Sequence, residues 1–125
     1  MKQDPIVVLV VEDEPVVRAL VVDVLEDAGC EVIESPTADH AVTVLEKRPD
    51  IRVVFTDVHM PGRLDGFQLA RIVEDYHHHA RVIVASGRRG PEPGDISPST
   101  RFMFKPYKTA LLVEAVRDAA ALAGR

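Results

Sequence analysis

The sequence predicts an open α/β fold in which a parallel five-stranded sheet is wound with helices on both faces. Short apolar runs alternate with segments whose apolar residues recur at helical spacing, which is the pattern of βαβ units. The runs at residues 6–11, 53–56 and 82–85 are almost unbroken, as expected of central strands that are covered on both sides. A length of 125 residues is that of one ordinary domain, so we expect a single domain over residues 1–125.

The elements alternate in order along the chain. The first helical stripe covers residues 17–28, with Pro15 near its first turn and Gly29 at its end. Thr109 is a candidate N-cap for the last stripe, and Asp65 or Gly66 lies near the start of the third stripe. Helical stripes are also predicted at residues 38–45, 69–76 and 112–119, and strands with charged residues, which suit the sheet edges, at 31–34 and 101–104.

One segment breaks the alternation. A helix is expected between the fourth and fifth strands, yet residues 87–100 contain three prolines and three glycines. Each interior proline costs a helix about 3 kcal/mol and each glycine nearly 1 kcal/mol relative to alanine. The fourth helix is therefore predicted to be short or absent.

Composition places the chain among soluble globular proteins, because 46% of its residues are hydrophobic and 28% are charged. The net charge of −5 argues against direct binding of nucleic acid. The longest apolar run, residues 6–11, is too short to span a membrane and does not resemble a signal peptide. A single cysteine, Cys30, excludes an internal disulfide framework, so we expect a cytoplasmic protein.

Charged side chains follow three of the predicted strands. Glu12 and Asp13 come after the first strand, Asp57 ends the third, and Lys105 follows the fifth. The carboxyl ends of parallel strands share one edge of the sheet, so these groups are expected to meet there. Two carboxylates about 4 Å apart repel by about 4 kcal/mol at an effective dielectric near 20, so such a cluster requires a cation. The pattern predicts a site for a divalent metal and phosphoryl transfer.

Each of these residues also has an ordinary explanation when taken alone. Asp13 could cap a helix, Lys105 could be a surface lysine, and Asp57 could begin an Asx-turn. Their coincidence at strand ends favours the shared site. The run at residues 77–79 is three histidines, but adjacent helical side chains point about 100° apart, so we expect a solvated helix end there.

Four motifs in order resemble the response-regulator receiver domain over essentially the whole chain, and specifically its chemotaxis-type, stand-alone form. The motifs are VVEDEP at residues 10–15, TDVHMPG at 56–62 followed by Asp65-Gly66, VASG at 84–87 and FKPY at 104–107. The resemblance implies a flavodoxin-like sheet of order 2-1-3-4-5. Because the prolines and glycines oppose a fourth helix, residues 87–100 are expected to form a mobile loop over the phosphorylation site.

The resemblance also implies roles for individual residues. Asp57 would be the phosphoacceptor, attacking the phosphorus of a phosphohistidine on a partner. Asp13 and Asp57 would ligate Mg²⁺ directly, Glu12 would hold it closely or through water, and the backbone carbonyl of His59 would add an oxygen. These are ligands that suit a hard cation.

The remaining roles fall on the last two strands. Ser86 would donate its hydroxyl to one phosphoryl oxygen, and Lys105 would pair with another, so both would be catalytic together with Asp57. Ser86 and Phe102 would act as the switch that reports phosphorylation.

The function that this resemblance implies is a receiver in a two-component phosphorelay. The partners would be a histidine kinase or histidine phosphotransfer protein and an unknown downstream protein, with no nucleic acid and no membrane. The chain would catalyse only its own phosphorylation and dephosphorylation. Two alternatives are a pseudo-receiver that never carries phosphate and an aspartyl-nucleophile phosphatase that resembles the haloacid dehalogenases, which place an acid where His59 stands here.

The chain departs from the family pattern at three places. Glu12 replaces an aspartate that is frequent in the family, and Phe102 lacks the hydroxyl of a tyrosine. The turn that begins after Asp57 has two residues, Arg63 and Leu64, before its Asp-Gly pair, where one is common. That longer turn is expected to lie beside the metal site.

Overall fold

The computed structural model describes residues 4–88 and 90–123. Within these residues it contains five strands and four helices. In chain order they are β1 (Val7–Val11), α1 (Pro15–Asp27), β2 (Glu31–Ser35), α2 (Ala38–Lys47), β3 (Val53–Asp57), α3 (Gly66–Tyr76), β4 (Arg81–Ser86), β5 (Arg101–Phe104) and α4 (Thr109–Leu122).

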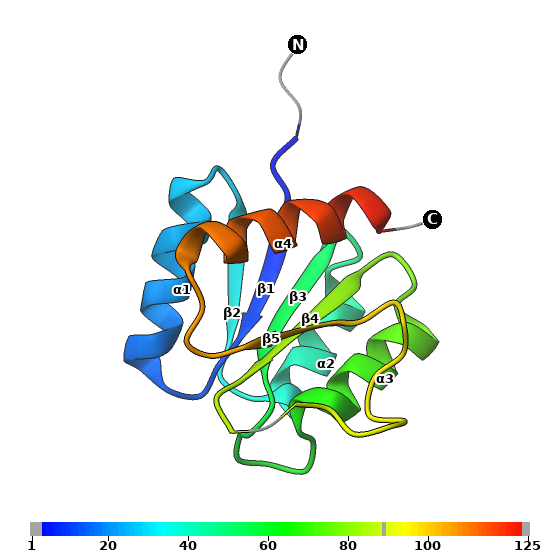
Figure 1. Cartoon of the computed structure of the whole chain (residues 1–125). Helices are drawn as coiled ribbons and strands as arrows, with labels where there is room; N and C mark the ends of the chain where they lie inside the picture. Colours follow the sequence, from blue (N-terminus) through cyan, green and yellow to red (C-terminus); the bar gives the residue numbers. More distant parts are fainter. Residues whose placement is uncertain (1–3, 89, 124–125) are drawn as a thin grey trace.

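All five strands form one parallel sheet in the order β2-β1-β3-β4-β5, as the sequence predicted. Helices α1 and α4 cover one face and α2 and α3 the other (Figure 1). The strand order reverses between β1 and β3, where Val11 pairs with Thr56. Glu12 follows Val11 just past the end of β1, and Asp57 follows Thr56 as the last residue of β3. The topology therefore places Glu12 and Asp57 side by side at the carboxyl edge.

The core consists of two apolar clusters, one on each side of the sheet. Leu9 and Val54 point into the cluster under α2 and α3, whereas Val8 and Val53 point into the cluster under α1 and α4. Successive side chains of a strand point to opposite faces, so a strand that is covered on both sides must be apolar at every position. This requirement explains the unbroken apolar runs.

The helix boundaries follow local signals in the sequence. Helix α1 begins at Pro15 and ends before Gly29, whose φ of 91° reverses the chain. Helix α3 begins with a capping box in which Asp65 and Gln68 each accept a backbone N–H of the other at 2.8 Å.

The predicted N-cap of α4 is displaced by one residue. Thr109 is the first helical residue, and Lys108 occupies the N-cap position with an extended backbone. The backbone N–H groups of Leu111 and Leu112 both donate to the Lys108 carbonyl, at 2.9 and 3.3 Å. The first turn is therefore closed by backbone bonds, with no side-chain cap.

The segment between β4 and β5 contains no helix in its described residues, 87–88 and 90–100, which confirms the prediction. Two turns replace it, closed by Asp95 N–H to Glu92 carbonyl at 3.0 Å and by Thr100 N–H to Ser97 carbonyl at 3.1 Å. The guanidinium of Arg71 on α3 donates to the Gly94 carbonyl at 2.6 Å. The segment therefore lies along α3 at this point, and its mobility stays a prediction.

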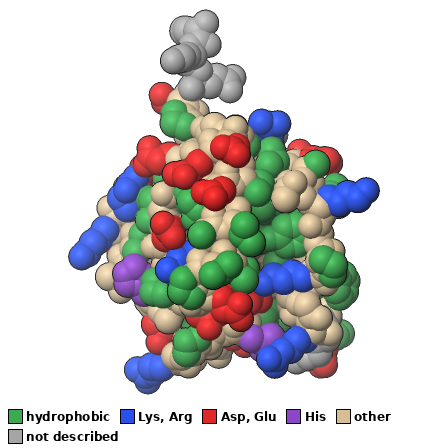
Figure 2. Space-filling view, turned by 90° about the vertical axis from the view of Figure 1, so that its left-hand side faces the viewer, with side chains coloured by type: hydrophobic (Ala, Val, Ile, Leu, Met, Phe, Trp, Pro, Cys, Tyr) green, Lys and Arg blue, Asp and Glu red, His purple; other side chains and the backbone are tan. Residues whose placement is uncertain are grey.

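The surface of α1 exposes two large apolar side chains. Val16 is 74% exposed and Leu20 is 62% exposed, and a spacing of four residues places both on one face of the helix. Hydrophobic side chains lie beside groups of acidic ones over this side of the molecule (Figure 2). Among the described residues, no helix is both long and apolar enough to cross a membrane.

The start of α3 comes unusually close to the end of β3. A Cβ atom added to Gly66 would lie 2.2 Å from the carbonyl oxygen of Asp57, and Gly66 N–H donates to the Val58 carbonyl at 2.9 Å. Glycine is required at this position because no side chain fits between the two backbones.

We predict that Gly66→Ala lowers the free energy of unfolding by about 2–3 kcal/mol, because the methyl group forces α3 away from β3. Urea denaturation followed by circular dichroism measures the change. Gly87→Ala is the matched control, since its Cβ would lie an ordinary 3.7 Å from Cβ of Lys105. Equal stability of the two variants would contradict the steric argument.

Candidate functional site

The carboxylate of Asp57 is fixed by its own strand end. Its Oδ1 accepts the N–H of Val58 at 2.7 Å, and the hydroxyl of Thr56 donates to its backbone carbonyl at 2.8 Å. The other oxygen, Oδ2, lies 3.4 Å from Nζ of Lys105. The half-buried carboxylate therefore has one oxygen occupied by the backbone and one that faces a cation.

Glu12 is the most deeply buried acid of the site, with 5% of its surface exposed. Its Oε2 accepts the N–H of Glu14 at 3.1 Å, and its Oε1 lies 3.5 Å from Nζ of Lys105. Glu14 is the N-cap residue of α1 and makes no side-chain cap bond. The hypothesis that Asp13 caps this helix is therefore wrong, because the carboxylate that reaches the helix start is that of Glu12.

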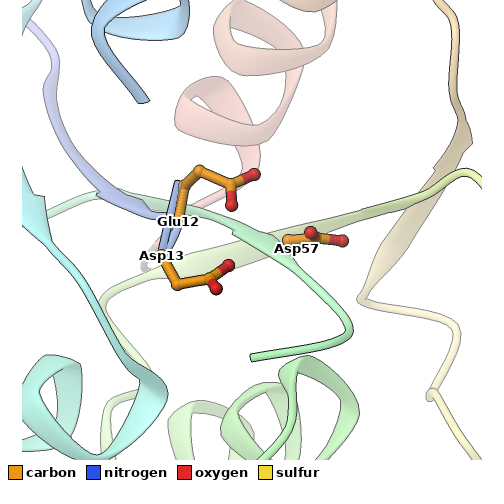
Figure 3. A group of neighbouring side chains, drawn as sticks. All are labelled: Glu12, Asp13 and Asp57. Atoms are coloured by element: carbon orange, nitrogen blue, oxygen red, sulfur yellow. The ribbon is translucent and has the colours of Figure 1, made fainter. Parts of the chain in front are cut away.

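Glu12, Asp13 and Asp57 converge on one space at the carboxyl edge (Figure 3). One carboxylate oxygen from each lies within 4.8 Å of the others. Among the described residues, the ammonium that pairs with this cluster is that of Lys105, 3.5 Å from Glu12 Oε1 and 3.4 Å from Asp57 Oδ2, so negative charge is in excess. Three oxygen donors with unbalanced charge suit Mg²⁺, a hard cation that takes a few carboxylates and keeps several waters.

The charge excess affects the protonation of two neighbouring groups. Burial raises the pKa of Glu12, and the Asp13 side chain and the Asp57 charge add to this, while the Glu14 N–H and Lys105 oppose it. Burial also raises the pKa of Tyr107 to about 12, with further contributions from the charges of Glu12 and Asp57. The Tyr107 phenol therefore stays protonated at neutral pH and serves packing.

Lys105 reaches the acids from just past the end of β5, the edge strand beyond β4. Its backbone N–H donates to the Ser86 carbonyl at 2.9 Å, which ties the ends of β4 and β5 together. Ser86 is 1% exposed, and its hydroxyl oxygen accepts the N–H of Arg88 at 3.2 Å. Accepting this bond leaves the hydroxyl hydrogen of Ser86 able to donate, so the side chain can serve as a donor to a phosphoryl oxygen.

The contacts of Phe102 and His59 do not test the roles that were predicted for them. Phe102 is half-buried, stacked on Phe67 at a centroid distance of 6.4 Å and edge-on to Phe104 at 4.9 Å. His59 is exposed in the turn two residues after Asp57. The switch role of Phe102 and the ligand role of the His59 carbonyl stay predictions.

Two residues that brace the site have no signal in the sequence motifs. The guanidinium of Arg18 donates to the Glu12 carbonyl at 2.7 Å and pairs with Glu34 at 3.1 Å. Asp39 on α2 accepts backbone N–H groups of the turn that begins after Asp57. These partners are brought together only by the packing of helices, so residue spacing could not reveal them.

The histidine run lies outside the site. Helix α3 ends at Tyr76, so His77 and His79 are not helical, and their rings meet edge to face at 5.9 Å. Burial is the main cause that lowers the pKa of the half-buried His77, and the charge of His79 lowers this pKa further. His77 is the C-cap residue of α3, so the run lies at a helix end as predicted, with His78 exposed and His77 and His79 half-buried.

Comparison with known proteins identifies the family. The model of the response regulator receiver domain matches residues 8–117. The chain belongs to this family. It is 35% identical over 112 residues to the nitrogen assimilation regulatory protein NtrX of Azorhizobium caulinodans. The aligned region covers 85% of this chain and 24% of NtrX. The receiver therefore spans about a quarter of that relative.

Solved structures agree with this assignment. The receiver domain of the hybrid histidine kinase CckA is 30% identical, with a TM-score of 0.78 over 91% of this chain and 98% of that domain. A response regulator receiver protein from Sinorhizobium medicae has a TM-score of 0.87 over 94% of this chain and 96% of its own, and at 24% identity it shows the fold.

The chain is thus a receiver domain of the two-component type, a signal-transduction module. Family membership implies a histidine kinase or a phosphotransfer protein as a partner and a Mg²⁺ site at the acidic cluster. The narrower prediction of a chemotaxis-type, stand-alone protein over residues 1–125 stays a prediction.

We predict that Asp13→Ala weakens Mg²⁺ binding by roughly tenfold or more, and more than Glu12→Ala does. The Glu12 carboxylate is already bonded to the Glu14 N–H and faces Lys105, whereas Asp13 is less buried. Titration followed by amide NMR measures both dissociation constants, with Asp23→Ala on the outer face of α1 as the control. A larger loss from Glu12→Ala would refute the assignment.

Proposed function

We propose that Asp57 accepts a phosphoryl group from the phosphohistidine of a histidine kinase or phosphotransfer protein, in a reaction that depends on Mg²⁺. The observation that carries this proposal is the position of Asp57 Oδ2, 3.4 Å from Lys105 Nζ and beside the carboxylates of Glu12 and Asp13. Phosphoryl transfer needs alignment and charge neutralisation more than covalent help from the protein.

The chain's own residues align the reaction. The Val58 N–H holds Oδ1 of Asp57, which leaves Oδ2 to attack the phosphorus. A bond forms between Oδ2 and phosphorus while the bond between phosphorus and the imidazole nitrogen breaks. The electron pair of the broken bond stays on that nitrogen, and the histidine leaves as a neutral imidazole when its other nitrogen is protonated.

The surrounding groups balance the charge of the transferred phosphoryl group. The Lys105 ammonium would pair with one of its oxygens, and the Ser86 hydroxyl would donate to another. Asp13, Asp57 and, directly or through water, Glu12 would hold Mg²⁺, which supplies the remaining positive charge. The aspartyl phosphate would carry a charge of about −1.5 to −2.

The same contacts would produce the signal. If the Ser86 hydroxyl donates to a phosphoryl oxygen, it would pull on the loop that is bonded to it through the Arg88 N–H. Lys105 would move with the end of β5, and Phe102 on that strand rests against Phe67 of α3. A local change of charge would thus rearrange the β4–β5 side of the molecule and change its protein contacts.

The surface of α1 supports a protein as the donor. Val16 and Leu20 form an exposed apolar face on the helix that directly follows Glu12 and Asp13. Apolar side chains beside a charged site suit the docking of another protein better than the binding of a small metabolite. A chain with this function would therefore turn over no small-molecule substrate in the usual sense.

The two alternatives have less support. A pseudo-receiver commonly lacks the acceptor or the lysine, and both Asp57 and Lys105 are present and face each other. An aspartyl-nucleophile phosphatase of the haloacid dehalogenase type would need an acid at the position of His59. Neither alternative explains the four groups at one sheet edge as well as phosphoryl acceptance does.

We predict that incubation with acetyl phosphate and Mg²⁺ adds one phosphoryl group to the wild-type protein and none to Asp57→Asn. The amide keeps the size of the side chain but removes the nucleophilic oxygen. Intact-mass spectrometry detects the addition, and Asp23→Asn serves as a control that should label fully. Equal labelling of Asp57→Asn would sink the assignment.

Lys105→Ala should still accept some phosphate on Asp57 but should lose the coupling to conformational change. Such couplings amount to about 1–3 kcal/mol, which one charge-assisted contact can supply. Amide spectra with and without beryllofluoride test this, with the exposed Lys108→Ala as the matched control. A full wild-type response in Lys105→Ala would contradict the mechanism.

A further inference from the structure

A carboxylate from another helix holds the turn between β3 and α3. The N–H of Arg63 donates to Oδ2 of Asp39, and the N–H of Leu64 donates to Oδ1, each at 3.0 Å. Asp39 lies in the first turn of α2, so the two partners are more than twenty residues apart in sequence. Bonds between a carboxylate and backbone N–H groups are charge-assisted and stronger than neutral ones.

The backbone of the turn is shaped around this carboxylate. Gly62 has a φ of 111°, a conformation that suits glycine, and it turns the chain so that two successive N–H groups point the same way. A Cβ atom on Gly62 would lie 3.1 Å from Oδ2 of Asp39. Successive N–H groups of this kind form a concave anion site, and here Asp39 fills it.

Asp39 projects from a rigid base. The Thr37 hydroxyl caps α2 by accepting the His40 N–H at 3.1 Å, and Ala38 and Ala41 on either side are fully buried in the core. The helix cannot shift without disturbing the packing under the sheet. The carboxylate therefore holds the turn at a fixed position relative to the core.

The other end of the turn is tied to the phosphoacceptor strand. Gly66 N–H donates to the Val58 carbonyl, and Val58 N–H donates to Oδ1 of Asp57. Residues 59–65 thus run between the backbone that orients Asp57 and the bonds to Asp39. A movement of the turn would change the position of His59 and the orientation of the Asp57 carboxylate together.

The length of the turn matches this arrangement. Arg63 and Leu64 occupy the place where the family commonly has one residue, and they are the two residues whose N–H groups meet Asp39. The extra residue supplies the second donor. The longer turn and Asp39 therefore form one structural unit.

We propose that Asp39 is a positioning residue for the phosphoacceptor site, which fixes the turn beside Asp57 so that the site is preorganised for Mg²⁺. The consequence for phosphorylation rests on the function proposed above, but the effect on the turn and on Mg²⁺ binding does not. Loss of the carboxylate frees the turn, and the site must then order it again each time the cation binds.

The first test compares Asp39→Ala with Glu46→Ala, which removes the same charge from the far end of the same helix. In the free protein, the amide signals of Arg63 and Leu64 should lose their hydrogen-exchange protection in Asp39→Ala alone. Mg²⁺ titration should show a dissociation constant raised roughly fivefold in Asp39→Ala and unchanged in Glu46→Ala. Unchanged protection and affinity in Asp39→Ala would overturn the proposal.

Salt separates positioning from simple charge attraction. At about 1 M KCl the Debye length falls to about 3 Å, so the loss of a distant charge no longer matters. The ratio of mutant to wild-type dissociation constants should persist at high salt. A ratio that returns to one would show that Asp39 acts only by its charge and would refute its role as a positioning residue.

A second variant leaves α2 intact and guards against misfolding of the first. Deletion of Arg63 removes one of the two donors and should raise the Mg²⁺ dissociation constant by a similar factor. Combining the deletion with Asp39→Ala should add little, because both changes break the same unit. Fully additive effects would contradict the proposal.

Phosphorylation gives the last readout. With acetyl phosphate, Asp39→Ala should need more Mg²⁺ for half-maximal rate, while the rate at saturating Mg²⁺ should stay within about twofold of wild type. A lower saturating rate with an unchanged Mg²⁺ requirement would overturn the proposal. If the wild-type protein takes up no phosphate, the proposed function fails, whereas the exchange and titration results still decide the role of Asp39.

Discussion

The structure of the carboxyl edge depends on one electrostatic constraint, the gathering of three carboxylates beside the ammonium of Lys105. Oxygens of Glu12 and Asp57 lie 3.5 and 3.4 Å from Nζ, and the Asp13 oxygen completes the cluster. Like charges this close are unfavourable by themselves, and burial of Glu12 adds a desolvation cost. A protein that maintains such a cluster gains by binding a cation or an anion–cation pair there, as a phosphoryl-transfer site does.

The fold makes this gathering possible at little cost to stability. A parallel sheet whose order reverses between β1 and β3 brings the ends of both strands to one crevice, and the edge strand β5 places Lys105 within reach. The two core clusters, one on each face, shield these strands from water. Stability therefore resides in apolar burial below the edge, which leaves the edge free to hold charges that weaken it.

The two sides of the site differ in how firmly they are held. On the α2–α3 side, Asp39 and the contact of Gly66 with Asp57 fix the backbone closely. On the β4–β5 side, where the residues that would respond to phosphate lie, turns replace a helix among the described residues, and the Ser86 hydroxyl is bonded to its own loop through the Arg88 N–H. A site that must keep its metal ligands still and yet transmit a change needs one firm side and one side that can rearrange.

The sequence predicted the architecture and the principal site residues because each depends on a local pattern. Unbroken apolar runs indicate strands covered on both faces, and polar residues after such runs must share an edge once the strands are parallel. The missing helix was equally predictable, since three prolines act on the backbone whatever surrounds them.

Contacts between separate elements were decided by tertiary structure alone. The sequence could not show that Asp39 fills the turn at Leu64, because that contact depends on where α2 docks. Nor could it show how deeply each acid is buried, and burial is the largest cause that raises the pKa of Glu12. Chain patterns fix which groups arrive at the edge, and packing fixes their distances and their partners.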